Sequence, residues 1–188
     1  DNIILENIRL PGPTVTGVAI TSATGGQNST LNAGDVVFAT VTMSANTTVD
    51  TTGGTPTLGL NIGGTVVQAA YVSGTGTTSL VFQYTIQSGQ TDANGISIDA
   101  NGIALNGGTL KDASANNVTL TFSAVTDNGS YQVDTTAPAT PSVPNLAISS
   151  DTGSSGTDDL TNYSTPTFTG TANPYTGNML ASRKRKLR

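Results

Sequence analysis

Four aspartates flank a proline-rich segment, TTAPATPSVP, and their type and spacing suit them to metal binding. Asp134 precedes that segment, and Asp151, Asp158 and Asp159 follow it within SDTGSSGTDD. Ca²⁺ takes roughly six to eight oxygen ligands from carboxylates, carbonyls and water. If the segment brings its two ends together, the carboxylates repel one another, and a divalent cation turns that repulsion into a stiff hinge. We predict calcium at these four residues; the alternative is solvated turn acids beside a flexible linker.

The same region contains two motifs that point to other chemistry. DTGSS at 151–155 matches the Asp-Thr-Gly of aspartic proteases, but that mechanism needs two aspartates sharing a proton, and the chain has no second Asp-Thr-Gly. GSSGTDDLT at 153–161 is close to the nonapeptide of calcium-binding β-rolls, which act as several stacked copies, and one copy is present. The chain has neither His nor Cys to serve nucleophilic catalysis. We therefore predict that the protein is not an enzyme.

Two further motifs are interpreted as turns. TDANGISIDANGIAL at 91–105 contains DANGI twice, which is typical of Asx and Asn-Gly turns around a short strand. GGT occurs at 53–55, 63–65 and 107–109 without the lysine or helix that a phosphate-binding loop requires. Neither motif predicts a ligand site.

Charge and composition limit the partners. All twelve acids precede residue 183, and five of the seven basic residues lie in the final RKRKLR. The acidic body repels phosphate, so we expect no nucleic-acid partner, and the tail has no counterpart upstream, which favours a non-native origin. No run approaches the roughly 20 apolar residues of a membrane span. Because cysteine is absent, stability has to come from packing and bound ions.

Alternating Thr, Val and Ile predict an all-β chain. In VVFATVTM, for example, Val37, Ala39, Val41 and Met43 share one face. The predicted strands cover residues 15–23, 35–44, 56–62, 65–73, 78–86, 95–100, 118–126 and 130–134. Short strands separated by Asn-Gly and Gly-Gly turns are typical of an antiparallel Ig-like or cadherin-like β-sandwich.

Composition also predicts five parts of the chain. They are an N-terminal extension or a strand of a neighbouring unit at 1–12, the sandwich at 13–136, a Pro-rich linker at 137–144, a partial second Ig-like repeat at 145–177 and a basic tail at 178–188. The second β unit is too short to close a two-sheet core, so it is either truncated or completed by another chain through an exposed edge.

Residues 13–138, from PTVTGVAITSATGGQNSTLNAGD through VFQYTIQSGQTDANGISI to YQVDTTAP, resemble one repeat of giant bacterial surface proteins. This Ig-like tandem repeat is associated with cyanobacterial swimming proteins and RTX-type adhesins, and SDTGSSGTDDLTNYSTPTFTGTA resembles the start of a second bacterial Ig-like repeat. The resemblance implies a secreted or cell-surface stalk whose neighbouring repeats are joined at calcium-binding aspartates.

Two other functions stay open from the residues. A self-assembling extracellular filament or matrix subunit would use its incomplete ends for strand exchange between chains, as a homo-oligomer. A carbohydrate-binding β-sandwich would need a row of exposed aromatics, and the chain has no Trp and five scattered Tyr.

Overall fold

The computed structural model describes residues 11–172, and these divide between two units, Asp1–Thr136 and Ala137–Arg188. The predicted basic tail, 178–188, and residues 1–10 of the predicted N-terminal extension lie outside the described residues. Within 11–172 there is no helix, and so none of the length and apolarity needed to cross a membrane.

The regular secondary structure of residues 11–172 consists of β-strands, which confirms the all-β prediction. The strands are β1 (Val15–Thr24), β2 (Thr30–Leu31), β3 (Val36–Asp50), β4 (Thr57–Ile62), β5 (Thr65–Ser73), β6 (Thr77–Thr85), β7 (Thr91–Asp92), β8 (Ile103–Ala104), β9 (Thr109–Lys111), β10 (Gln132–Asp134), β11 (Asn145–Leu146) and β12 (Phe168–Thr169).

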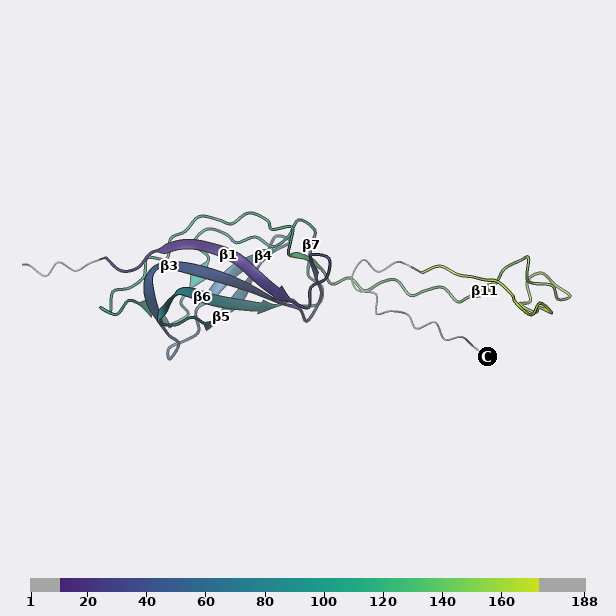
Figure 1. Ribbon diagram of the computed structural model, residues 1–188, viewed down its shortest axis with the longest axis horizontal. Helices are drawn as coiled ribbons and strands as arrows, with labels where there is room; N and C mark the ends of the chain where they lie inside the picture. The colour runs from purple at the N-terminus through teal and green to yellow at the C-terminus, as the bar shows by residue number, and fades with distance from the viewer. Residues whose placement is uncertain (1–10, 173–188) are drawn as a thin grey trace, which may run out of the picture. The chain divides into compact units, whose positions relative to one another are not determined.

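A curled antiparallel sheet organises unit 1 (Figure 1). Its strand order is β1-β3-β6-β5-β4-β8, and β9 pairs with the C-terminal part of β3. β3 can pair with β6 along its first part and with β9 along its last part, because its pairing with β6 shifts register between Thr42 and Thr47. Such irregularities bend a strand. The strand predicted at 35–44 is therefore longer than expected, and its extension holds β9 through Val49 and Leu110.

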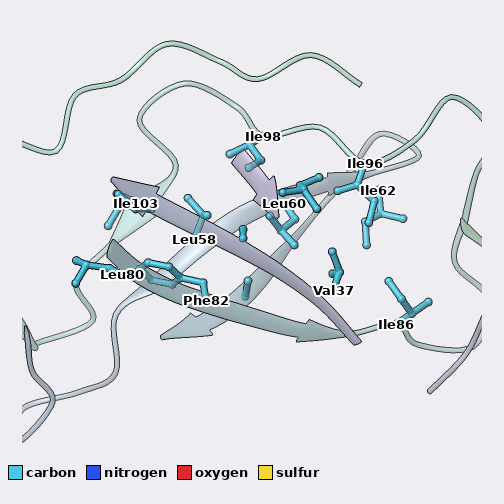
Figure 2. Close-up of a cluster of buried hydrophobic side chains, with 14 of the residues drawn as sticks. Val37, Leu58, Leu60, Ile62, Leu80, Phe82, Ile86, Ile96, Ile98 and Ile103 are labelled. Carbon is cyan, nitrogen blue, oxygen red and sulfur yellow. The ribbon is translucent and has the colours of Figure 1, made fainter. Parts of the chain in front are cut away.

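One face of this sheet builds the core. The side chains that alternation placed on a common face, Val37, Ala39, Val41 and Met43, are all buried, as is Phe82 opposite Ala39. Figure 2 shows side chains from several strands meeting in this interior. Each large aliphatic or aromatic side chain buried there stabilises the fold by about 1.5–3 kcal/mol.

Two predicted strands, 95–100 and 118–126, are not continuous strands in the structure. They make only isolated bridges, such as Asn61 with Ser97 and Ile98 with Val125. At Phe122 a side chain takes the place of a ladder partner, because the amide of Phe122 donates to Asn101 Oδ1 at 2.9 Å. Irregular segments and the small sheet β2-β10-β7 therefore accompany the curled sheet. Within 95–100 the alternating Ile96 and Ile98 are buried.

Two of the three GGT segments pack against each other through their backbones. A Cβ atom placed on Gly54 would lie 1.8 Å from the carbonyl oxygen of Asn106, and one on Gly108 would lie 2.4 Å from that of Gly54. Only glycine allows this approach, because any side chain would overlap a main-chain atom. These glycines join the loop after β3 to the loop before β9.

Unit 2 contains one two-stranded antiparallel sheet in its described part. β11 and β12 pair through Asn145 with Thr169 and Leu146 with Phe168. Leu146 is buried, whereas Phe168 is 62% exposed. The residues between these strands form a long irregular loop, 147–167, which contains three of the four predicted calcium ligands.

Candidate metal centre

The loop of unit 2 brings Asp151, Asp158 and Asp159 into one acidic cluster. The amide of Leu146 on β11 donates to Asp159 Oδ1, and the amide of Leu160 donates to Asp158 Oδ1, each at 3.2 Å. On the other side of the cluster, the amide of Asp151 donates to the carbonyl of Ala147 at 2.9 Å. Asp159 has a positive φ of 56°, which aspartate tolerates better than most residues. Short-range bonds to the backbone thus hold the carboxylates near one another.

Asp151 is the buried member of the cluster. Its side chain is 8% exposed, and its Oδ1 atom is buried without a hydrogen-bond partner among residues 11–172. Burial raises the pKa of this carboxyl, and the nearby carboxylates of Asp158 and Asp159 raise it further by repulsion, against a lowering by the backbone of Asp159. A buried carboxylate oxygen without a hydrogen-bond partner destabilises a fold, so protonation or cation binding at Asp151 Oδ1 would be stabilising.

Asp134, the fourth predicted ligand, belongs to unit 1. It ends β10, where it pairs with Thr91, and its Oδ1 accepts the amide of Thr136 at 2.9 Å. This is an Asx-type turn at the start of the proline-rich segment. Three of the four predicted residues therefore lie in one loop of unit 2, whereas Asp134 lies at the end of β10 in unit 1.

The chemistry of the cluster suits a hard cation, since its side-chain donors are carboxylate oxygens. Yet no three acidic side chains within 11–172 converge in the geometry of a metal site. Asp158 and Asp159 each accept a backbone amide at Oδ1, and the buried Oδ1 of Asp151 has no hydrogen-bond partner among residues 11–172. The donor set fits calcium by type, and ligation would require the three carboxylates to converge further.

A second acidic site was not predicted as such from the sequence. Asp92 is 5% exposed, and its carboxylate accepts the amides of Gly63 and Gly95, both at 2.9 Å. Nearby, the side-chain amide of Asn94 donates to the Asp127 carboxylate. Gly63, Asp92, Asn94 and Asp127 line a polar pocket of about 230 Å³. The repeated DANGI motif was the signal, because its first aspartate forms the expected turn and also anchors the β4–β5 hairpin.

No family model, curated protein or solved structure matches this chain.

Proposed function

We propose that this chain is a structural repeat of a secreted or cell-surface bacterial adhesin or stalk protein, stiffened by calcium at the joint between repeats. One observation supports the calcium part above all: the buried Oδ1 of Asp151 has no partner among the described residues and lies in a cluster with two further carboxylates. Its partners would be the neighbouring repeats of the same chain, and its role would be mechanical rather than enzymatic.

In this proposal unit 1 is an Ig-like or cadherin-like sandwich repeat, and unit 2 is part of the next one. Unit 1 has one continuous apolar core, which includes Val37 and Ile98. This core supports the proposal that unit 1 folds by itself as a spacer. The buried carboxylate of Asp92 is fully engaged by backbone amides, which suits a structural role better than proton transfer.

Calcium would be held by Asp151, Asp158 and Asp159 of unit 2. When bound, the ion supplies positive charge to a segment, 137–172, that has three acids and no base. It would thereby relieve both the desolvation of Asp151 and the repulsion among the aspartates.

The test is hydrogen exchange of the segment around β11 and β12, in calcium and in chelator, with small-angle scattering of the same samples. Calcium should slow exchange of the Asp151 amide and stiffen the particle, and Asp158→Asn should abolish both effects. Asp99→Asn, which replaces an exposed aspartate of unit 1, is the matched control. Identical exchange in calcium and chelator would remove the metal from the proposal and leave a calcium-independent spacer.

A second candidate function, a filament subunit that exchanges strands between chains, is favoured by the apolar surface of unit 2. Among the described residues, Val143, Ile148, Leu160 and Phe168 are each more than 60% exposed, and all belong to this unit. Exposed apolar side chains beside short, open strands can pair with another chain. Light scattering over a concentration series separates the two functions, because a stalk repeat keeps its monomer mass and a filament subunit does not.

A further inference from the structure

A polar groove lies beside the C-terminal part of β1 in unit 1. We name it the β1 groove; it encloses about 400 Å³, and its lining includes Thr21, Ser22, Ser29, Leu31, Ser130 and Tyr131. Sites for small ligands commonly enclose roughly 300–1,000 Å³. The β1 groove therefore has room for a small molecule.

The lining combines hydroxyl groups with apolar groups. Ser22, Ser29 and Ser130 are exposed, so their hydroxyls can donate hydrogen bonds to a ligand and accept them from it. Leu31 is buried, and Tyr131 is partly buried against the core. A saccharide has the same combination, since its ring carries hydroxyls at the edge and C–H groups on its faces, and these C–H groups pack well against an aromatic ring.

The charges in and around the groove favour a neutral ligand. No residue that lines it is charged. The closest carboxylate along β1 belongs to Asp35, and a Cβ atom placed on Gly25 would lie 1.9 Å from its Oδ1. Gly25 directly precedes Gly26, a lining residue. A carboxylate so close to the groove repels anions, which makes a neutral sugar a better ligand than a uronic acid or a phosphate.

Ser29 occupies a backbone position that usually favours glycine. Gln27 and Thr30 exchange two backbone hydrogen bonds of 2.8 Å each, and the residues between them, Asn28 and Ser29, have φ values of 50° and 64°. This is the geometry of a type I′ turn, in which Asn-Gly is a preferred pair. A serine with a positive φ is strained, and such strain concentrates at functional sites. The strained position thus gives the groove a hydroxyl that glycine would lack.

We propose that the β1 groove binds one ring of a neutral saccharide, which hydrogen-bonds to Ser29 and Ser130 and packs its C–H face against Tyr131. One tyrosine suits a single sugar ring, whereas a long polysaccharide would need the row of aromatics that the chain lacks. This binding goes beyond the mechanical role proposed above. It is independent of calcium, because all residues of the groove belong to unit 1.

Backbone-amide NMR of the full chain, titrated with glucose, galactose and N-acetylglucosamine, tests the proposal. At least one sugar should shift the amide signals of Ser22, Ser29 and Tyr131, and the matching uronic acid should shift them less. Ser29→Gly should weaken binding by about three- to tenfold, as the loss of one hydrogen bond predicts. Its melting temperature should not fall, because glycine relieves the strained φ. Tyr131→Leu should abolish binding, but it also alters the core, so Ser29→Gly is the deciding variant.

The matched control is Ser73→Gly, which changes an exposed serine of β5, three strands away from β1 in the sheet, and should leave binding unchanged. Amide signals that no sugar shifts, or an unchanged affinity in Ser29→Gly, would overturn the proposal. A peptide with the sequence of β1, VTGVAITSAT, is the second probe. Shifts caused by this peptide instead of the sugars would also overturn it, since the groove would then be an edge for strand pairing.

Discussion

At the scale of residues, two aspartates have pKa shifts of opposite direction, and their surroundings explain the difference. Asp50 accepts the hydroxyl of Thr52 at 2.6 Å and its amide at 2.9 Å, and these bonds lower the pKa of its carboxyl. Asp151 is buried with one oxygen unpartnered, which raises the pKa of its carboxyl. The first setting favours the carboxylate, and the second opposes it.

For Asp50 the consequence is a small stabilisation present above the unfolded pKa of about 3.9 and lost as the pH falls through the lower folded pKa. Thr52→Val removes the hydroxyl donor, so the pKa of Asp50 should rise towards its ordinary value. An NMR titration of the Asp50 carboxyl carbon measures this shift. An unmoved Asp50 titration would contradict the assignment to Thr52.

For Asp151 the expected effect of Asp151→Asn depends on calcium. In chelator the variant should slow hydrogen exchange across β11 and β12, because a buried unpaired charge has been replaced by a neutral amide. With calcium present, the variant should lose the added protection that the original chain gains. Opposite effects in the two buffers identify a cation-binding carboxylate, whereas the same effect in both identifies a purely structural one.

Asp151 also illustrates how far the sequence predicts the candidate site. The sequence placed Asp151, Asp158 and Asp159 in one acidic loop, and in the structure Asp158 and Asp159 lie close enough to act on the carboxyl of Asp151. The sequence could not indicate that Asp151 is buried, because the residues around it are Ser, Thr and Gly, whose pattern has no apolar face. Nor could it indicate that Asp92 lies against Gly63, 29 positions away, since tertiary pairing creates that contact.

At the scale of elements, long strands with strict alternation were predictable and short ones were not. β5 has the predicted bounds, β1 and β4 differ from prediction by one residue at one end, and β6 differs by one residue at each end. β2, β7, β8 and β9 have two or three residues each, too few for a period of two to be recognised. Segment 118–126 alternates well, yet it makes isolated bridges instead of a ladder, and the amide of Phe122 donates to a side chain; its alternating Val118, Leu120 and Phe122 are partly buried against the core.

The contact between the glycine loops gives a prediction at this scale. Gly108→Ala should destabilise unit 1 by about 1–3 kcal/mol, because the new methyl group would meet the carbonyl oxygens of Gly54 and Asp50 at 2.4 and 2.8 Å. Chemical denaturation measures the loss. Gly129→Ala is the control, since its nearest atom is 3.9 Å away, and its effect should stay within about 0.5 kcal/mol. If the free energy of unfolding fell no more in Gly108→Ala than in Gly129→Ala, the two glycine loops would be able to separate at little cost.

At the scale of the whole molecule, the two units differ in how much they bury. Unit 1 contains every member of the main apolar core, while Leu146 is the buried aliphatic side chain in the described part of unit 2. Limited proteolysis should therefore cut first within 137–172, where the exposed residues concentrate. The released fragment ending near Thr136 should keep the melting temperature of unit 1 in the full chain. A fragment that melts clearly lower would show that unit 2 supports unit 1.

The pairing of β1 with β3 has a mechanical consequence. Val15 starts β1 at one end of unit 1, and the chain leaves the opposite end beyond β10 (Figure 1). A pull applied between these two points acts along β1, so its eight residue pairs with β3 share the load in shear instead of opening one after another. Strands loaded in this direction yield only when many hydrogen bonds break together. Unit 1 is thus oriented to resist tension between the ends of its own chain.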